Sequence, residues 1–361
     1  MTHTWVQPFV DRLKKPTEQA ATLRVVRETA DGPVVSGARA VGTLAPLSDT
    51  NLVVLGRMQL SEEEQDFAIA FTQPVDMAGL RWICRDPYDQ GRSYFDAPLS
   101  GRVDEIDAIA VFDECLIPWE NLIIYRDIEI FNKQVEHIRL VDTLAHHVLI
   151  KNIAKTRFML GLAHLIAESS QINSFINVQE RLGDFAIYLA NLESLAIAAV
   201  EGAVQDPHNG LWYPNPTTMW VSLRLYPEYY VNMVNHLMQL GGSGYMNQPQ
   251  ERTLERYGAA LEDYFRGATR DAHQKVSLFR MAWDLIGSGW AGRQELYERF
   301  FFGDMQLMKA RQYQLMDKSD AVAMVERLLT GRSTPEQPFP IPEKFGGPPL
   351  EAGTGMPSST P

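Results

Sequence analysis

The densest group of chemically competent side chains lies in residues 287–304. Glycines at 287, 289 and 292 permit positive φ or a close approach of the backbone to a ligand, and a short amphipathic helix ending at Gly303 is expected to follow them. This helix would carry Arg293, Glu295, Tyr297, Arg299 and Phe300. The spacing fits a helix-to-helix corner with a Glu295/Arg299 ion pair, and it equally fits a loop that faces a ligand.

A second glycine group, at Gly241, Gly242 and Gly244, follows an apolar helical pattern. One glycine is sufficient to end a helix in the left-handed conformation, so three exceed what a cap requires. Glycines also let backbone amides approach an anion, which makes the loop a candidate phosphate-binding nest. A GxGxxG frame after a strand is absent from the sequence, and a doubly wound dinucleotide fold is therefore not expected.

The histidines give weaker signals. His137, His146 and His147 lack the spacing of metal ligands on one helix face and have no HExxH-like frame, so no metal site is expected and we interpret them as residues of the core or beside a bound ligand. His3 lies near the chain start, where side chains are usually solvated. Its imidazole nevertheless offers a hydrogen-bonding group that titrates near neutral pH.

Composition limits the partners. The 361 residues carry 33 Lys+Arg against 45 Asp+Glu, a net charge of -12, which disfavours nucleic acid and anionic membranes as partners. Cys84 and Cys115 are too few for a disulfide framework, and we expect both to be reduced core residues. With no targeting segment and no apolar run of membrane-spanning length, a soluble cytoplasmic protein is expected.

Two patterns divide the chain. Residues 21–130 contain short β-rich runs separated by turn residues, which predict one antiparallel β-barrel or sandwich domain with a two-residue hairpin at Asp31 and Gly32. Residues 131–330 show helical periods and predict an up-down bundle, so the fold class is α+β. Residues 1–20 are expected to form an extended lead-in, and residues 331–361, with eight prolines, a disordered tail.

Residues 292–304 resemble a signature of the oxygenase component of 4-hydroxyphenylacetate 3-monooxygenase, a family of reduced-flavin-dependent aromatic hydroxylases. Residues 37–46, 98–107 and 111–120 resemble the same family in the same order, and the similarity runs from about residue 2 to residue 330. The resemblance implies an acyl-CoA-dehydrogenase-like fold. Family members also carry a helical domain ahead of the point where this chain begins, and we expect this chain to lack it.

The resemblance also implies site residues. His3 would face a phenolic substrate, Thr43 would hydrogen-bond the isoalloxazine ring, and Asp11 and Arg12 would lie near the flavin. The glycine loop at 241–244 would receive the pyrophosphate or adenine side of FAD across a subunit interface. Arg293 and Asp304 would also contact the cofactor, although Met305 to Leu307 replace a segment that often contains a basic residue.

The activity implied is ortho-hydroxylation of a 4-hydroxyphenylacetate-like phenol by O2 and FADH2 through a C4a-hydroperoxyflavin, with the reduced flavin supplied by a separate NAD(P)H:flavin reductase. The protein would be a homo-oligomer, either a tetramer or a dimer. The alternative is a non-catalytic or truncated flavin-binding or assembly subunit of the same family. The related 4-hydroxybutyryl-CoA dehydratase needs cysteines for an iron-sulfur cluster, and residues 145–153 contain none.

Overall fold

The computed structural model describes residues 1–8, 10–11, 13–54 and 58–329. By its internal contacts the chain divides into two units, Met1–Lys309 and Ala310–Pro361. The second unit begins inside helix α9 (Met305–Leu315) and contains α10 (Ser319–Leu329). The predicted domain boundaries at residues 20 and 130 remain predictions, and the predicted tail, 331–361, lies outside the described residues.

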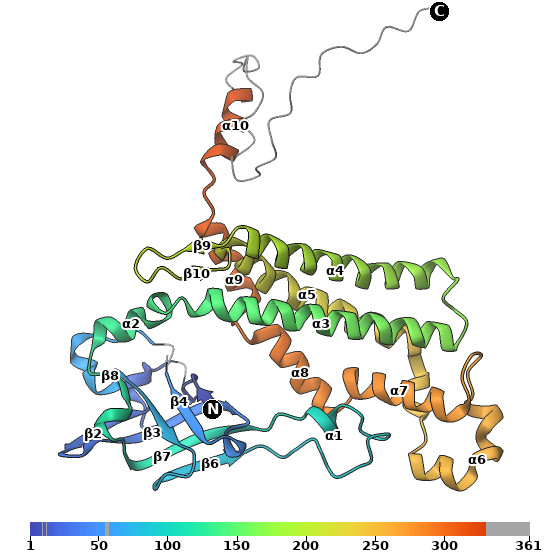
Figure 1. The fold of residues 1–361 in the computed structure, drawn as a ribbon, viewed down its shortest axis with the longest axis horizontal. Helices are drawn as coiled ribbons and strands as arrows, with labels where there is room; N and C mark the ends of the chain where they lie inside the picture. Colours follow the sequence, from blue (N-terminus) through green and yellow to red (C-terminus); the bar gives the residue numbers. More distant parts are fainter. Residues whose placement is uncertain (9, 12, 55–57, 330–361) are drawn as a thin grey trace, which may run out of the picture. The chain divides into compact units, whose positions relative to one another are not determined.

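The β-rich segment forms two four-stranded sheets (Figure 1). The first sheet contains, in order, β1 (Thr2–Thr4), β4 (Thr50–Val53), β5 (Ile69–Pro74) and β8 (Leu122–Tyr125). The second contains β2 (Arg24–Thr29), β3 (Gly32–Thr43), β7 (Asp107–Leu116) and β6 (Leu80–Cys84). The predicted hairpin joins β2 to β3, and the pairs within both sheets are antiparallel except for β1 with β4.

Alternation of side chains places the core of this domain between the two sheets. Val53, Ile69 and Phe71 from the first sheet pack with Ala110 and Phe112 from the second. The Phe71 and Phe112 rings meet edge to face, with their centroids 5.7 Å apart. Residues two apart on a strand share a face, so the apolar alternation that predicted the strands also builds this core. Cys115 belongs to the core as expected, whereas Cys84 is exposed at the end of β6.

The segment predicted as an extended lead-in, residues 1–20, contains the short strand β1. His3 pairs with Leu52 in the parallel β1–β4 ladder, and the backbone N–H of Ala40 donates to the carbonyl of Val6 at 2.7 Å. The side chains of Thr2 and Thr4 are buried. Local sequence did not reveal the strand because its partners lie some 50 residues away in the chain.

Three consecutive glutamates, Glu62 to Glu64, lie between β4 and β5. Ser61 and Glu64 form a reciprocal capping box at the start of a 3-10 turn, Glu62–Phe67. The side-chain oxygen of Glu64 accepts from the backbone N–H of Ser61 at 2.9 Å. The three glutamates therefore begin a helical turn, where carboxylates favour the N-terminal end. Arg57 lies outside the described residues.

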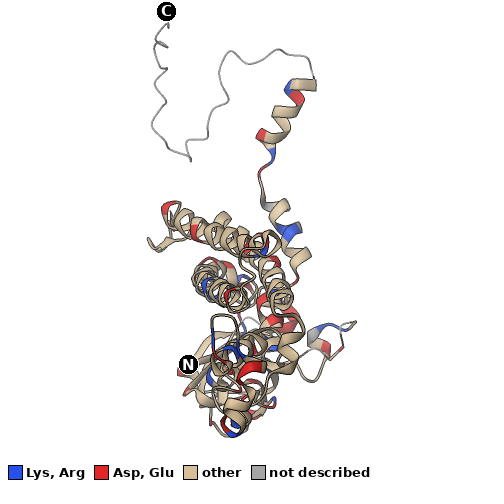
Figure 2. Cartoon of the chain, turned by 90° about the vertical axis from the view of Figure 1, so that its right-hand side faces the viewer, with Lys and Arg blue, Asp and Glu red and all other residues tan. Residues whose placement is uncertain are grey.

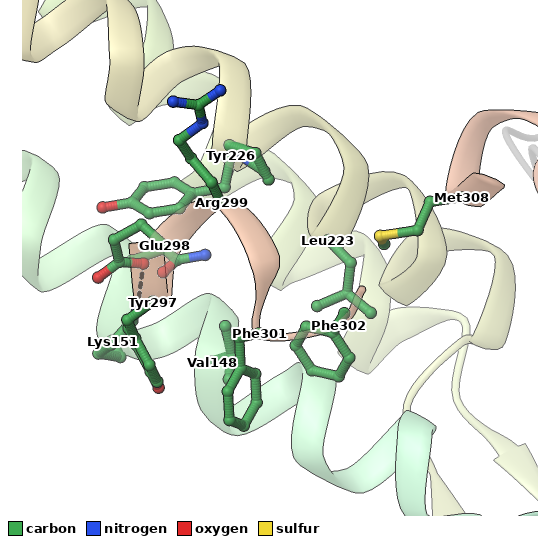
Figure 3. Close-up of a pocket in the computed structure, with 12 residues that line it drawn as sticks. Val148, Lys151, Leu223, Tyr226, Tyr297, Glu298, Arg299, Phe301, Phe302 and Met308 are labelled. Atoms are coloured by element: carbon green, nitrogen blue, oxygen red, sulfur yellow. Dashed lines mark hydrogen bonds and ion pairs between the residues drawn. The ribbon is translucent and has the colours of Figure 1, made fainter. Parts of the chain in front are cut away.

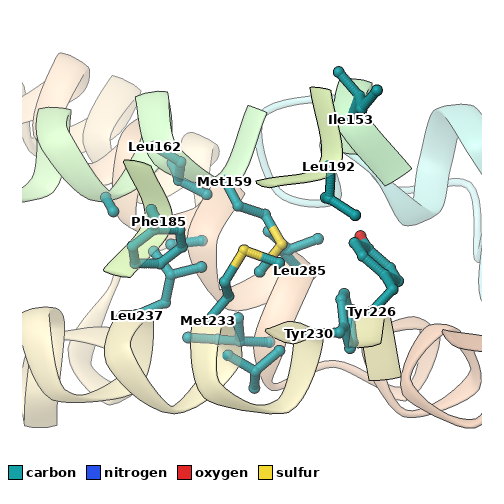
Figure 4. Packing of buried hydrophobic residues seen from close by; sticks show 14 of the residues in the cluster. Ile153, Met159, Leu162, Phe185, Leu192, Tyr226, Tyr230, Met233, Leu237 and Leu285 are labelled. Carbon is teal, nitrogen blue, oxygen red and sulfur yellow. The ribbon is translucent and has the colours of Figure 1, made fainter. Parts of the chain in front are cut away.

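Helices follow the sheets and form the second layer of the first unit. They are α2 (Ile128–His137), α3 (Leu140–Ser169), α4 (Ile176–Glu201), α5 (Pro216–Gly241), α6 (Glu251–Phe265), α7 (Ala272–Ile286) and α8 (Gly289–Phe300). Side chains of α3, α4, α5 and α7 interlock in one apolar cluster, including Met159, Phe185, Met233, Leu237 and Leu285 (Figure 4). A small hairpin, β9 (Val204–Gln205) with β10 (Trp212–Tyr213), lies between α4 and α5.

Helix α4 leaves much of its apolar surface uncovered. Ile176, Ile187 and Ile197 are all exposed. Among the helices within the described ranges, α4 is the one whose length and composition would suit a membrane span, and 17% of its most apolar window is buried. The same test is passed by core helices of soluble proteins, so this single helix is weak evidence for a membrane. It packs against α3 and α5 as a bundle helix.

Candidate active site

Local residues stabilise helix α8 (Gly289–Phe300). The hydroxyl oxygen of Ser288 caps it by accepting from the backbone N–H of Ala291 at 3.1 Å. A Cβ on Gly289 would lie 3.0 Å from the ring of Tyr88, so glycine allows this loop of the β domain to pack directly against the helix start. The expected i,i+4 pair is present, with Arg299 donating to Glu295 at 2.9 Å.

Arg293 projects from α8 to the start of β7. Its Nε and Nη2 atoms donate to the two carboxylate oxygens of Asp107 at 3.0 and 2.8 Å, and Nη1 donates to Glu105 at 2.9 Å. Burial alone would raise the pKa of Asp107, but the hydrogen bonds and charge of Arg293 outweigh it and hold the pKa below its ordinary value. The bidentate pair therefore joins the helical bundle to the sheet.

Thr43 completes this junction. Its hydroxyl donates to Asp107 at 2.9 Å, while its carbonyl accepts from the hydroxyl of Thr2 on β1 at 2.5 Å. Because the hydroxyl proton is directed at Asp107, the oxygen of Thr43 remains available as an acceptor. We refer to Thr2, Thr43, Asp107 and Arg293 as the junction cluster.

A row of aromatic side chains, Tyr297, Phe301 and Trp5, connects Arg293 to His3. The guanidinium carbon of Arg293 lies 5.6 Å from the ring centre of Tyr297, and Tyr297 packs on Phe301 with centroids 5.0 Å apart. Phe301 lies 6.4 Å from Trp5, whose ring stacks on His3 at 4.1 Å. Contacts on both sides of β1 therefore bring His3, Thr43 and Arg293 into one region of the structure.

A cavity of about 160 Å³ opens beside His3. It is lined by Met1, Thr2, His3, Trp5, Leu52, Val54, Ile138 and Leu140. A cavity of about this size holds one benzene ring in a protein interior. Burial lowers the pKa of His3 below 6.5, so the imidazole is neutral at pH 7 and has one nitrogen that can accept a hydrogen bond.

The remaining predicted residues lie elsewhere. Asp304 caps α9 by accepting from the backbone N–H groups of Gln306 and Leu307 at 2.8 and 3.0 Å. Asp11 accepts from the N–H of Leu13 in an exposed turn, and Arg12 lies outside the described residues. Among the described residues, neither aspartate has a side-chain hydrogen bond to the junction cluster, and their roles toward a cofactor remain predictions.

The packing around the loop at 241–244 explains why glycines occupy it. A Cβ on Gly241 would lie 2.1 Å from the ring of Tyr245, which folds back so that its hydroxyl donates to the carbonyl of Leu237 at 2.8 Å. Gly244 lies against Phe279, and Gly242 has φ +49 with open space where a side chain would stand. The loop follows the end of α5 and packs on α7.

The histidines of the first bundle helices are not core residues. His137 and His147 are exposed, and His146 is half-buried. Within the described ranges, no group of three or more His, Cys, Asp or Glu side chains has an arrangement that could hold a metal ion.

Sequence reasoning missed the residues that tie the site together. Asp107 accepts from Thr43, Arg293 and Arg85, and Arg85 also donates to Asp104 at 2.7 Å. Asp107 stood inside a recognised motif, and its position at the first residue of an alternating strand was the signal that could have identified it. Trp5 gave no local signal, because its partners come from β1 and from the far end of α8.

Two family models match the chain. The description of the first is "4-hydroxyphenylacetate 3-hydroxylase N terminal", over residues 1–124, and of the second "4-hydroxyphenylacetate 3-hydroxylase C terminal", over residues 131–330. The chain belongs to the 4-hydroxyphenylacetate 3-hydroxylase family. The predicted family assignment is thus confirmed.

Individual members of the 4-hydroxyphenylacetate 3-hydroxylase family agree with this. The oxygenase component of 4-hydroxyphenylacetate 3-monooxygenase from Thermus thermophilus is 36% identical over 321 residues, which are 88% of this chain and 66% of that protein. A crystal structure of such a component with FAD and 4-hydroxyphenylacetate has 34% identity and a TM-score of 0.85, covering 91% of this chain and 69% of the other. The chain therefore spans about two thirds of the length of these relatives.

The fold class is confirmed as acyl-CoA-dehydrogenase-like. The structure of an acyl-CoA dehydrogenase from Geobacillus kaustophilus matches with a TM-score of 0.56 and 16% identity, over 87% of this chain and 68% of that one. At this identity the match describes the architecture alone, a β domain combined with a helical bundle.

Proposed function

We propose that this chain acts in FADH2-dependent hydroxylation of a 4-hydroxyphenylacetate-like phenol, as the oxygenase of a two-component system. The observation that carries the proposal is the cavity beside His3, because its size suits one aromatic ring and its wall is apolar apart from an imidazole and a threonine. The protein would be soluble and cytoplasmic, and a separate NAD(P)H:flavin reductase would supply the reduced flavin.

The residues present fit a flavin at this place. The indole N–H of Trp5 is buried and has no hydrogen-bond partner among the described residues, so a carbonyl oxygen of a bound ring would satisfy it. Thr43 offers an acceptor oxygen for a ring N–H, and Trp5 and Phe301 offer flat apolar surface. Reduced FAD, when bound, supplies the two electrons that activate O2.

The chain's own residues orient the phenol and exclude water. Neutral His3 accepts a hydrogen bond from the phenol O–H, which increases electron density on the ring carbon next to the hydroxyl and favours transfer of oxygen to that carbon. The aliphatic side chains of Leu52, Ile138 and Leu140 line this space, so a bound ring displaces water from apolar surface. In the balanced reaction, phenol, O2 and FADH2 give catechol, FAD and water.

The assembly we propose is a homo-oligomer, a tetramer or dimer, in which Gly241, Gly242 and Gly244 of one copy receive the phosphate side of FAD bound to another. The open space beside Gly242 supports this arrangement. Light scattering after size-exclusion chromatography tests it, and a monomer that binds FADH2 with full affinity would contradict it.

The test of the activity is anaerobic titration with FADH2 followed by mixing with 18O2 and 4-hydroxyphenylacetate. We expect 3,4-dihydroxyphenylacetate with one labelled oxygen atom, and little product from His3→Ala. Binding of FADH2 with release of H2O2 alone would favour the alternative, a flavin-binding or assembly subunit. Absence of FADH2 binding would exclude the oxygenase and a flavin-binding subunit, and stable assembly without that binding would favour an assembly subunit.

A further inference from the structure

Two lysines of α3 converge on one buried carboxylate of α8. Lys151 and Lys155 stand one helical turn apart on the same face, and their Nζ atoms lie 2.5 and 2.6 Å from the two oxygens of Glu298. Figure 3 shows the contact between Lys151 and Glu298. Lys155 also donates to Gln294 at 3.0 Å. The Glu298 side chain is only 2% exposed, so both of its oxygens depend on these lysines. We refer to Lys151, Lys155 and Glu298 as the lysine clamp.

The clamp holds more positive than negative charge. Two ammonium groups face one carboxylate, with Glu105 contributing from the start of the sheet and Arg299 lining the same small cavity. Tyr226 of α5 and Tyr297 of α8 face Lys151, with ring centres 5.4 and 4.7 Å from its Nζ. Burial is the main reason that the pKa of Lys151 falls to about 8, and the charge of Lys155 lowers it further against the opposing pull of Glu298.

Glu105 offsets part of this excess of positive charge, whereas the tyrosine beside Lys155 offsets none of it. Tyr230 faces Lys155 at 5.3 Å, and burial raises the pKa of Tyr230 far above neutral, so it stays uncharged. Acidic and basic residues are intermixed along the chain in Figure 2, so the net negative charge of the protein leaves room for a local cationic cluster. The adjoining cavity measures about 20 Å³, enough for one water and too small for a substrate ring.

The clamp and the candidate active site share one helix. Glu298 follows Tyr297 directly, lies five residues after Arg293, and stands one turn before the phenylalanines at 301 and 302. A helix turns by about 100° per residue, so any rotation of α8 that released Glu298 would also withdraw Arg293 from Asp107. Fixing Glu298 therefore fixes where Arg293, Tyr297 and Phe301 stand relative to Thr43 and His3.

We propose that Glu298, held by Lys151 and Lys155, is a positioning residue that keeps α8 in the rotation required for coupled hydroxylation at the His3 cavity. This inference rests on the function proposed above and adds a set of residues outside the cavity. The clamp touches neither substrate nor flavin. The clamp acts through Arg293 and Tyr297. Its loss should lower the amount of catechol formed per FADH2 consumed, without preventing the phenol from entering the His3 cavity.

The experiment measures catechol formed per FADH2 consumed, with H2O2 as the competing product. We expect Glu298→Gln to lower this coupling at least threefold per folded molecule, with KM for the phenol changed less than twofold, and Glu298→Asp to restore part of it. The matched control is Glu295→Gln, one turn earlier on α8 in the partly exposed pair with Arg299, and its coupling should stay within 1.5-fold of the unmodified protein.

A second variant, Lys151→Met, keeps the proposal testable if Glu298→Gln does not fold. Lys151→Met leaves the Lys155–Glu298 pair, and at pH 7 it should show the coupling that the unmodified protein shows at pH 9, with no further change between those pH values. Unchanged coupling in Glu298→Gln, or a retained pH dependence in Lys151→Met, would overturn the proposal. An unmodified protein that neither binds FADH2 nor forms catechol would instead reject the proposed function itself.

Discussion

The two ends of α8 are held by ionic contacts of opposite balance. At the sheet end, Arg293 meets two carboxylates, Asp107 and Glu105, and the acid is stabilised in its charged form. At the bundle end, Glu298 meets two lysines, and burial drives the pKa of Lys151 down to about 8. The comparison teaches that similar distances do not imply similar energetics. At the sheet end the hydrogen bonds and charge of Arg293 outweigh the cost of burying Asp107, whereas at the bundle end the cost of burying Lys151 outweighs the attraction of Glu298.

The largest effect should come from removing the acid at the sheet end. Asp107→Ala leaves Arg293 buried without its bidentate partner and also frees Thr43, so the free energy of unfolding should fall by about 2–4 kcal/mol. The Asp107 pKa is depressed in the folded state, so this stabilisation is present above the unfolded value of 3.8 and is lost as pH falls below it. Urea unfolding at pH 7 and pH 3 measures both statements.

The control for that substitution is Asp113→Asn on the same strand. Asp113 pairs with Arg81 at 3.1 Å, and both side chains are more than half exposed. An exposed pair contributes less than about 1 kcal/mol. Equal losses from Asp107→Ala and Asp113→Asn would show that the junction cluster is no more than a surface ion pair.

The next effect concerns catalysis at the sheet end. His3→Gln should lower catechol formation by about 30- to 100-fold, because a glutamine amide is a poorer acceptor for the phenol proton than neutral imidazole. In the unmodified protein the rate should also fall as pH drops below 6.5, since protonation removes the acceptor nitrogen. Rate measurements from pH 5 to 8 check this, and an acidic limb that persists in His3→Gln would assign the titration to another group.

The bundle end should also become more stable as pH rises, but over a higher pH range than the sheet end. The pKa of Lys151 is about 8 in the folded protein and 10.5 when unfolded, so its burial cost is complete below pH 8 and disappears as pH rises to 10.5. Relative to Lys151→Met, the unmodified protein should therefore gain on the order of 1–3 kcal/mol over this range. Urea midpoints of the two proteins at pH 7 and pH 10 provide the measurement, and a constant difference would mean that Lys151 is not the titrating group.

The smallest effect should come from the third ion pair of the same helix. Glu295→Ala removes the partner of Arg299 on the partly exposed side of α8, and we expect a change of no more than about 0.5 kcal/mol in unfolding free energy. Thermal or urea unfolding is sufficient to measure it. A loss comparable to that of Asp107→Ala would remove the distinction between buried anchors and surface pairs.

Patterns with local causes were predictable from the sequence. The strands around Val25, Val35 and Phe71 and the long bundle helices followed from alternation and helical period, and the helix at 289–300 with its Glu295/Arg299 pair was placed correctly. The family assignment came from motifs that are contiguous in the chain. These features need no knowledge of what lies opposite in the fold.

Features that depend on distant partners were not predictable. The strand at Thr2–Thr4 forms because residues 51–53 lie beside it, and Asp107 acquires its importance from Arg293, 186 residues later. The lysines at 151 and 155 were unremarkable positions in a helix until Glu298 met them. Periodicity identifies which face of an element is buried, but it does not show which charged residue of another element will pack against that face.

The two cysteines make the junction accessible to spectroscopy. Cys115 is enclosed in the sheet core and burial raises its thiol pKa, whereas Cys84 is exposed and pairs in register with Ala108, the residue after Asp107. A maleimide dye or nitroxide would therefore attach at one place without any engineered substitution. Such a label would stand one strand away from the site and would report, in real time, whether the contact between sheet and helix loosens during turnover.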